Sequence, residues 1–355
     1  MQVVLCGYYG YGNAGDEALL ATLLEMLPDH CTPVILSADP VATERTYGVA
    51  ACPNRQPGPL LATLRASQAF IWGGGSLIQD ATSAFSPLYY LGLMTLAQQL
   101  GLTTLAWAQG IGPLRRPWVQ RLARPVFRGC TAVSVRDGGS ASLLQAWGVP
   151  HQLAPDPVWA MAGRPMTSPV PSQSRIAVVL RPHAWLTPAW IATLTEALAQ
   201  LQRATGAHLW LIPFQPSTDT ALAQALHAAL PHNSQVLIET DVHRLRGLFD
   251  HVNLVLGMRY HSLVMGAAAG RPCIGLSYDP KVSRLVQECG LLGWFLADSP
   301  PPAQDLAAAW VQYYASPPSQ TTYQDWVARA LSHQQLLHHT LGGPGHDSPA
   351  IHPHG

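Results

Sequence analysis

Residues 2–17, QVVLCGYYGYGNAGDE, decide the fold class of this chain. The apolar run at 2–6 predicts a buried strand, and a helical pattern starts at about residue 16. Between them lie Gly10, Gly12 and Gly15, spaced as GxGxxG. A glycine-rich turn between a strand and a helix is typical of a βαβ unit. The stretch therefore predicts a parallel sheet covered by helices.

The same alternation continues along both halves of the chain. The predicted strands are 2–6, 33–37, 69–72, 103–108 and 131–135, then 176–181, 207–212, 235–238, 253–256 and 272–276. The predicted helices are 16–27, 58–67, 87–100, 117–128 and 139–147, then 188–204, 218–230, 261–269 and 280–289. Such a series predicts an α/β protein with one doubly wound parallel sheet in each half.

The domain boundaries are predicted from changes in composition. We expect a Rossmann-like domain at 1–162, a Pro/Ser-rich linker at 163–175 and a second Rossmann-like domain at 176–295. Terminal helices broken near Pro317-Pro318 are expected at 304–341, and a disordered tail at 342–355. The 355 residues suit about two domains of roughly 150 residues. Two doubly wound domains would face a cleft, and ligands would bind beyond the carboxyl ends of the strands.

The composition excludes several classes of protein. Hydrophobic residues make up 48 % of the chain, which excludes wholesale disorder. Twenty basic and twenty acidic residues cancel, so no basic field favours a nucleic-acid partner. The six cysteines include no CxxC or other short ligand pair, and the N-terminus lacks the basic start of a signal peptide. We therefore expect a reduced, cytoplasmic chain with no metal site.

One long segment of the first half carries no charge, which raises the question of a membrane span. Residues 81–114 contain no charged side chain, but Pro87, the Gln98-Gln99 pair and Gly101 interrupt the apolar run. The longest apolar part is too short to span a bilayer, which needs about 18 residues. A buried helix followed by a buried strand explains it better, while contact with the inner face of a membrane stays open.

The first glycine-rich loop has three interpretations. With Asp39 at the end of the second strand, it matches the fingerprint of dinucleotide binding. Asp16 and Glu17 count against that interpretation, because carboxylates at a helix N-terminus repel a pyrophosphate. The second interpretation is a tight turn with an acidic cap. In the third interpretation Asn13 and Asp16 bind sugar hydroxyls, or Asp16 serves as a base for one of them.

Further candidate residues follow the other strands of the first half. Gly73, Gly74 and Gly75 follow strand 69–72 and expose backbone N–H groups, with Gln79 and Asp80 one turn later. Gln109 opens a third glycine-containing loop after strand 103–108. Arg136 follows strand 131–135. It predicts either a surface ion pair with Asp137 or an anion-binding guanidinium at the mouth of the cleft.

In the second half, a buried strand ends at Gly257 and a small-residue helix starts near His261. Arg259 and His261 therefore occupy a strand-to-helix loop, where a guanidinium and exposed N–H groups suit a carboxylate or phosphate. A core histidine bonded to the backbone is the structural alternative for His261. Arg181, at the end of strand 176–180 and followed by Pro182-His183, occupies the equivalent loop earlier in this half. Lys281 follows the last strand, where Asp279-Pro280 is also typical of an ordinary helix start.

Together these loops resemble the polysaccharide pyruvyl transferase family, CsaB type. The matching pieces are Gly7-Tyr8-Tyr9-Gly10, Gly12-Asn13-Ala14-Gly15-Asp16-Glu17-Ala18, Gly73-Gly74-Gly75, Gln109-Gly110-Ile111-Gly112-Pro113, Val135-Arg136-Asp137, Met258-Arg259-Tyr260-His261-Ser262 and Tyr278-Asp279-Pro280-Lys281-Val282. Each piece is short, but their order makes the joint match specific. The resemblance implies a glycosyltransferase-B-like fold.

It also implies transfer of the pyruvyl group of phosphoenolpyruvate to a sugar diol of a cell-surface polysaccharide or its lipid-linked precursor. The product would be a pyruvate ketal, with release of phosphate and without a cofactor. The family's donor site falls on Arg259, Tyr260 and His261. Its second donor arginine falls on Arg136, with Arg181 as a less certain substitute, so that guanidinium groups of both domains would hold the donor.

Within this interpretation His261 is the expected acid, and Asp16 is a hypothetical base. Two rival interpretations stay open. One is a nucleotide-sugar glycosyltransferase of the same fold, which would need a site for a nucleotide base and ribose. The other is a non-enzymatic carbohydrate- or nucleotide-binding protein, which would leave Arg259 and His261 without a purpose. The acceptor sugar, the ketal regiochemistry and the oligomeric state are not encoded in any recognisable motif.

Overall fold

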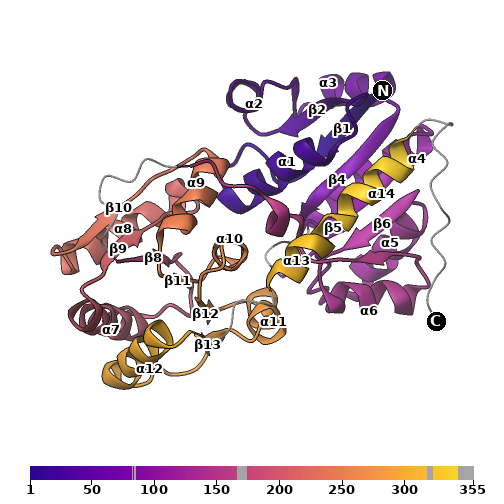
Figure 1. Ribbon diagram of the computed structural model, residues 1–355. Helices are drawn as coiled ribbons and strands as arrows, with labels where there is room; N and C mark the ends of the chain where they lie inside the picture. The colour runs from indigo at the N-terminus through magenta and orange to yellow at the C-terminus, as the bar shows by residue number, and fades with distance from the viewer. Residues whose placement is uncertain (82, 84, 166–173, 318–322, 343–355) are drawn as a thin grey trace. The chain divides into compact units, whose positions relative to one another are not determined.

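The structure is a computed structural model that describes residues 1–81, 83, 85–165, 174–317 and 323–342 (Figure 1). Its internal contacts divide the chain into two units. Unit 1 comprises Met1–Tyr11, Leu19–Pro157 and the chain from Ala328 onward, and unit 2 comprises Gly12–Ala18 and Val158–Val327. The predicted tail lies outside the described residues except for Gly342, as do residues 166–173 of the predicted linker.

Unit 1 contains a seven-stranded parallel sheet. Its strands are β1 (Gln2–Cys6), β2 (Thr32–Ser37), β3 (Ala51–Pro53), β4 (Ala69–Gly75), β5 (Thr103–Gln109), β6 (Ala132–Val135) and β7 (Gln152–Leu153), in the order β3-β2-β1-β4-β5-β6-β7. Its helices are α2 (Pro40–Tyr47), α3 (Pro57–Ala66), α4 (Phe85–Gln99), α5 (Pro117–Arg128), α6 (Gly138–Trp147) and α14 (Ser332–Leu341). Helix α1 (Ala14–Met26) begins in the segment that groups with unit 2.

Unit 2 contains a six-stranded parallel sheet. Its strands are β8 (Arg175–Val179), β9 (His208–Leu211), β10 (Ser234–Val236), β11 (Leu254–Gly257), β12 (Cys273–Ser277) and β13 (Leu292–Phe295), in the order β10-β9-β8-β11-β12-β13. Its helices are α7 (Pro188–Thr205), α8 (Pro216–Ala229), α9 (Val242–Leu248), α10 (Tyr260–Ala268), α11 (Pro280–Glu288) and α12 (Ala303–Ala315), followed by α13 (Tyr323–Ala330). Short 3₁₀ turns lie at Pro157–Ala160 and Phe249–His251.

Both sheets therefore confirm the predicted α/β class of two doubly wound, Rossmann-like halves. Their central strands are continuous apolar runs because helices cover both faces of a parallel sheet. All five residues of β8 and all seven of β4 are buried. The strand order reverses between β1 and β4 in unit 1 and between β8 and β11 in unit 2. Loops at the carboxyl ends of these strand pairs are where such sheets bind ligands.

The helix boundaries have local causes in the sequence. Asp39 accepts a hydrogen bond from the backbone N–H of Ala42 and caps α2, and Asp137 caps α6 in the same way through Ser140. At the other end of α6, Gly148 adopts the left-handed conformation (φ 65°) that stops a helix. Asp39 therefore has a structural role in starting α2.

The C-terminal helix α14 completes unit 1. It contacts β5 and β6, and Figure 1 shows it in yellow beside these strands. His333 of α14 is fully buried, with Nδ1 3.0 Å from the Ser134 hydroxyl and Nε2 3.0 Å from the Pro155 carbonyl oxygen. The indole N–H of Trp107 donates to the His333 carbonyl at 3.1 Å. The core of unit 1 is thus built from residues more than 200 positions apart in the sequence.

Several short elements were not predicted. Helix α2 buries only Thr43, so its sequence carries too weak an apolar stripe to show a helical period. The strands β3 and β7 are edge strands of three and two residues, and β3 ends in a proline. Helix α9 has seven residues and strand β13 has four, and such short elements show too little periodicity in the sequence to be predicted. The charge-free segment forms α4 and β5, as predicted, and no helix among the described residues is long and apolar enough to cross a membrane.

Candidate active site

The loop after β11 carries the predicted donor residues of unit 2. Arg259 precedes α10 in an extended conformation, and Tyr260 and His261 form the first turn of that helix. The strand before it ends in Gly257, where an added Cβ would lie 2.4 Å from the Ser262 hydroxyl oxygen. That hydroxyl donates to the Arg259 carbonyl at 2.6 Å. The tight turn is therefore held by a buried serine, and it fixes the backbone from which Arg259 extends.

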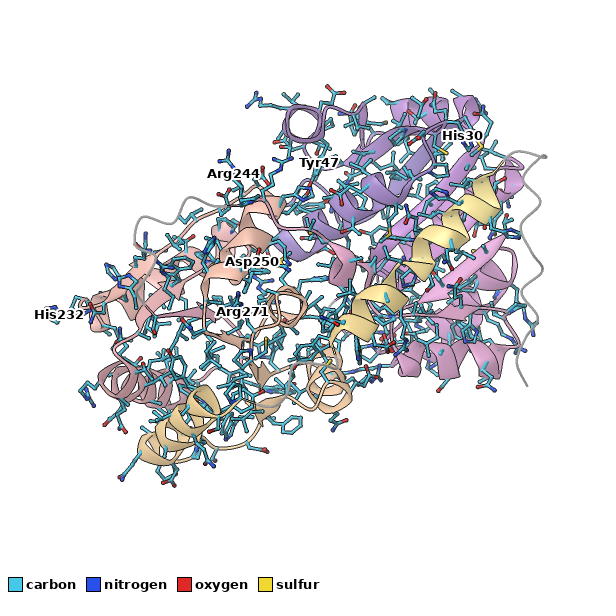
Figure 2. The ribbon with its side chains drawn as sticks, viewed as in Figure 1. His30, Tyr47, His232, Arg244, Asp250 and Arg271 are labelled. Carbon is cyan, nitrogen blue, oxygen red and sulfur yellow. The ribbon has the colours of Figure 1, made fainter. Side chains whose placement is uncertain are left out.

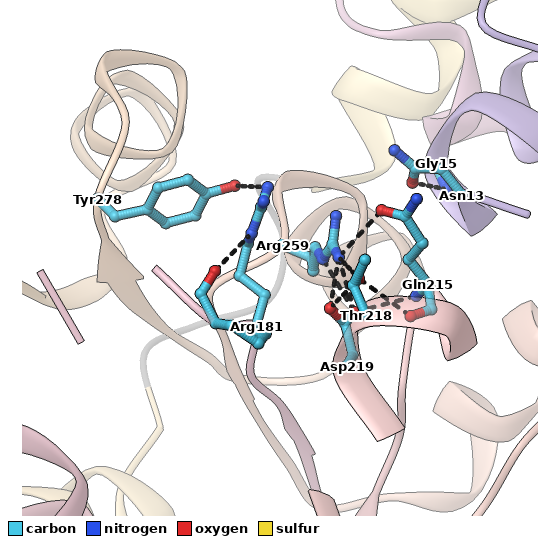
Figure 3. Close-up of polar contacts among 9 residues, drawn as sticks. Asn13, Gly15, Arg181, Gln215, Thr218, Asp219, Arg259 and Tyr278 are labelled. Carbon is cyan, nitrogen blue, oxygen red and sulfur yellow. Dashed lines mark hydrogen bonds and ion pairs between the residues drawn. The ribbon is translucent and has the colours of Figure 1, made fainter. Parts of the chain in front are cut away.

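The Arg259 guanidinium is almost completely buried and forms an ion pair with Asp219 (Figure 3). Its Nη2 donates to both Asp219 carboxylate oxygens at 2.6 and 2.8 Å, and its Nε donates to Oδ2 at 3.1 Å. Thr218 and Gln215 lie 3.3 and 3.4 Å from the same Nη2. The sequence predicted Arg259 as an anion ligand but gave no sign of Asp219. The two residues are 40 positions apart and lie on different loops.

The loop after β1 also contributes to unit 2. Residues 12–18 group with this unit, and the backbone N–H of Ala14 donates to the Phe214 carbonyl at 2.8 Å. Gly15 is packed against the imidazole, since an added Cβ would lie 2.2 Å from His261 Nδ1. The Asn13 side chain accepts from the Gly15 N–H at 3.1 Å. The predicted acid is thus brought next to the N-terminal turn of α1.

That turn of α1 carries both predicted carboxylates. Asp16 and Glu17 form the acidic first turn of the helix, and both side chains are half-buried. His261 is also half-buried, and its ring meets that of Tyr260 edge to face at 5.1 Å. The loop therefore combines an imidazole with a helix start rich in carboxylates, an arrangement suited to proton transfer.

Arg181 lies on the other side of the strand-order reversal, in the loop after β8. Its Nη1 donates to the Tyr278 hydroxyl at 3.1 Å, and its guanidinium carbon lies 5.2 Å from the centre of the Tyr278 ring (Figure 3). Tyr278 follows β12, so two loops of one sheet edge hold this arginine. Burial and the neighbouring Arg181 charge lower the pKa of His183. Asp279 caps α11, as expected of an ordinary helix start.

In unit 1, the glycines that end β4 have a clear steric cause. The strand extends through Gly75 instead of ending at 72 as predicted. Gly73 faces Tyr9, whose hydroxyl donates to the Gly73 carbonyl at 2.8 Å, and an added Cβ would lie 1.9 Å from that hydroxyl. Gly74 and Gly75 have φ of 85° and 87°, a region that favours glycine. The strand can therefore continue only with glycines at these positions.

Asp80 and Gln109 are both buried at the carboxyl edge of this sheet. The Asp80 carboxylate accepts from the backbone N–H groups of Arg115 and Arg116 at 2.7 and 2.8 Å, so it holds the loop after β5. Gln109 donates to the Trp72 and Trp107 carbonyls at 3.3 and 2.9 Å. Its Oε1 has no hydrogen-bond partner among the described residues. The side chain of Gln79 accepts from the Ala81 N–H at 3.0 Å.

Arg136 follows β6 and is 7 % exposed, which makes a surface ion pair with Asp137 the wrong interpretation. Its Nη1 lies 2.5 Å from the Asp156 carboxylate, and its Nη2 donates to the Ser76 hydroxyl at 3.0 Å. Asp137 caps α6 instead. Asp156 was not predicted, since it follows the two-residue strand β7 that the sequence pattern did not reveal. Arg136 and Arg259 therefore each have a buried aspartate as partner, whereas Arg181 contacts Tyr278.

Two parallel Rossmann-like sheets, each with polar loops at its carboxyl edge, define the architecture of glycosyltransferase-B-like transferases and sugar-nucleotide epimerases. The model of the polysaccharide pyruvyl transferase family matches residues 13–280, and the chain belongs to this family of transferases. The match spans loops of both units. A comparison with curated proteins gives no match.

Solved structures with the same fold are distant in sequence. A UDP-GlcNAc 2-epimerase from Methanocaldococcus jannaschii has a TM-score of 0.65 at 9 % identity, covering 97 % of this chain and 100 % of that one. A glycosyltransferase from Rickettsia africae has a TM-score of 0.56 at 12 % identity, covering 96 % and 98 %. HepE from Anabaena, in complex with UDP and glucose, has a TM-score of 0.57 at 13 % identity, covering 96 % and 99 %. These likenesses establish the fold.

Proposed function

We propose that the protein transfers the pyruvyl group of phosphoenolpyruvate to two hydroxyls of one sugar, forming a pyruvate ketal and releasing phosphate. The family match over residues 13–280 is the observation that carries the proposal. The acceptor would be a cell-surface polysaccharide or its lipid-linked precursor. The reaction would then take place in the cytoplasm, at the inner membrane face if the acceptor is lipid-linked.

The chemistry needs an acid, an anion site and hydroxyl activation. His261 would protonate the methylene carbon of phosphoenolpyruvate, which makes C2 electrophilic. A sugar hydroxyl would attack C2 and lose its proton. A second hydroxyl would then displace phosphate by breaking the bond from C2 to the phosphate oxygen, and the ring closes. Asp16 is the proposed base for one hydroxyl, because the first turn of α1 that carries it packs against His261 through Gly15.

The anionic groups of the donor would be bound by arginines. Arg259 and Arg181 lie in the two loops that flank the strand-order reversal of unit 2, so they are the proposed pair within that unit. Arg136 is the alternative second arginine that the family resemblance indicates. The loops of unit 1 with Gly73–Gly75 and Gln79 would serve the acceptor, and the buried Asp80 and Gln109 would hold these loops in place. In this scheme the guanidinium groups balance the donor charge, and we propose no metal or cofactor.

The decisive experiment measures phosphate release from phosphoenolpyruvate across a panel of extracted glycans, with mass spectrometry to detect the ketal. His261→Ala is expected to abolish transfer while the fold stays intact. Arg259→Ala is expected to raise the dissociation constant for phosphoenolpyruvate. Normal turnover in the His261 variant, or unchanged donor affinity in the Arg259 variant, would refute the assigned roles.

A nucleotide-sugar glycosyltransferase is the second candidate, because HepE, of the same fold, has been solved with UDP and glucose. A binding protein without catalysis is a third. Thermal shift separates them, since only the proposed function requires stabilisation by phosphoenolpyruvate, whereas the second requires stabilisation by a UDP-sugar. Stabilisation by phosphoenolpyruvate with no ketal on any glycan would favour a binding protein. Comparing Arg181→Ala with Arg136→Ala identifies the second donor arginine.

A further inference from the structure

Asp219 is a buried carboxylate that no prediction from the sequence included. It lies in the first turn of α8, in the loop region after β9, and its residue is 1 % exposed. Oδ2 accepts from the Gln215 N–H at 3.0 Å and Oδ1 from the Thr218 hydroxyl at 2.8 Å. These two donors come from its own turn, and the remaining donors all come from one side chain on another loop. That side chain is Arg259.

The pairing fixes the orientation of the Arg259 guanidinium. Three donor-acceptor contacts reach one carboxylate from Nε and Nη2, which together define the plane of the guanidinium. Nη1 is the one guanidinium nitrogen of Arg259 without a partner among the described residues. An arginine side chain is otherwise free to adopt many rotamers, and ordering it costs conformational entropy. The ion pair with Asp219 orders the Arg259 side chain before any ligand binds, so ligand binding does not have to order it.

We propose that Asp219 is a positioning residue that holds Arg259 with Nη1 directed to the anionic group of the donor. The inference rests on the proposed function, because it takes Arg259 as a donor ligand. The Arg259–Asp219 pair is close to neutral as a unit, so the pair recognises an anion mainly by directed N–H groups. Asp219 itself does not contact the donor in this scheme.

The test is Asp219→Asn, which keeps the size of the side chain and removes its charge. We expect KM for phosphoenolpyruvate to rise about 10- to 100-fold, by analogy with the loss of an outer partner that orients a metal ligand. A purely structural role predicts a lower melting temperature with unchanged KM in the folded fraction. Asp219→Glu keeps the charge but moves it by one methylene, and we expect a smaller rise in KM.

Two controls separate the positioning role from general effects of an ion pair. Asp250→Asn removes the carboxylate charge from the 2.8 Å pair with Arg246 in the same unit. Asp250, labelled in Figure 2, precedes β11 and so lies at the opposite edge of the sheet. We expect Asp250→Asn to leave KM unchanged. Thr218→Val removes one donor from the Asp219 carboxylate. We expect an effect well below that of Asp219→Asn.

A double-mutant cycle with Arg259→Gln tests whether Asp219 acts through this arginine. If Asp219 acts through Arg259, adding Asp219→Asn to the Arg259→Gln variant changes KM no further. The double variant also leaves no buried unpaired charge, because both side chains are then neutral. Additive effects on KM would overturn the proposal. The cycle stays informative if Asp219→Asn alone folds poorly.

Nuclear magnetic resonance of the Arg259 side chain gives a readout that does not depend on turnover. Restricted rotation of its guanidinium is expected in the wild-type protein and lost in Asp219→Asn. If the wild-type protein neither binds nor consumes phosphoenolpyruvate, the proposed function fails, and with it Arg259 as a ligand of this donor. Unchanged guanidinium rotation in Asp219→Asn would instead overturn the inference about Asp219, whatever the substrate.

Discussion

The buried His333 of α14 makes the stability of unit 1 depend on pH. Burial lowers the pKa of His333 from 6.5 to about 4, against the opposing effect of Asp156, and Arg136 adds to the lowering. The contacts define its neutral form, since Nε2–H donates to the Pro155 carbonyl while Nδ1 accepts from the Ser134 hydroxyl. The Ser134 oxygen in turn accepts from the backbone N–H of Ala108 at 2.8 Å.

The magnitude follows from the two pKa values. The unfolded chain takes up a proton at His333 near pH 6.5, and the folded chain does so only near pH 4, so the free energy of unfolding decreases as pH falls between them. Above pH 6.5 the effect is absent. At pH 5 the loss is about 2 kcal/mol, and at the lower limit it approaches about 3 kcal/mol, taking 1.36 kcal/mol per pKa unit.

The assay is amide hydrogen exchange of β5 and β6 at pH 8 and pH 5, which reports the opening of unit 1 without assuming a single transition for the chain. His333→Gln preserves one acceptor and one donor but does not titrate, and it is expected to remove about 2 kcal/mol of the pH-dependent loss. His339→Gln, at an exposed position of the same helix, is expected to behave as the wild-type protein does. An equal pH dependence in wild-type and His333→Gln protein would refute the reasoning.

Three further predictions concern the glycine loops and their partners. Gly15→Ala places a methyl group against the His261 ring and is expected to lower turnover at least tenfold. The free energy of unfolding should stay within about 1 kcal/mol of wild type, because alanine is a good helix former. Unchanged turnover would mean that the position of the His261 ring does not matter for catalysis. Tyr9→Phe removes the buried bond to the Gly73 carbonyl and is expected to cost about 1–3 kcal/mol in urea unfolding, so an unchanged midpoint would contradict it. Asp80→Asn weakens the hydrogen bonds from the backbone N–H groups of Arg115 and Arg116 in the loop after β5. It is expected to lower the free energy of unfolding by a similar amount, and faster proteolysis of that loop is the second readout.

The sequence was sufficient to predict the class of fold and most of its elements. Long apolar runs such as 69–72 and 103–108 predicted strands that the structure contains, because buried parallel strands have no polar face. Short edge elements such as β3 and β7 were missed, since two or three residues show no period. The glycine loop that begins at residue 10 was placed correctly between a strand and a helix, but α1 begins at Ala14, so Gly15 lies in the helix and not in the loop.

The environment of the candidate site was much less predictable. Arg259 and Arg136 were both selected because they follow buried strands, yet neither Asp219 nor Asp156 was identified as a partner. Each aspartate lies on a different loop from its arginine, and pairing between loops depends on the sheet topology that the sequence pattern leaves undetermined. The contact of Gly15 with His261 was missed for the same reason.

The position of α14 has a consequence for biosynthesis. Trp107 and Ser134, synthesised in the first half of the chain, obtain their partner His333 only after about two hundred further residues have been translated. The core of unit 1 therefore stays incomplete during translation until all the strands of unit 2 have been synthesised. A released chain truncated before residue 333 should accordingly be a better chaperone client and protease substrate than one that extends through residue 341.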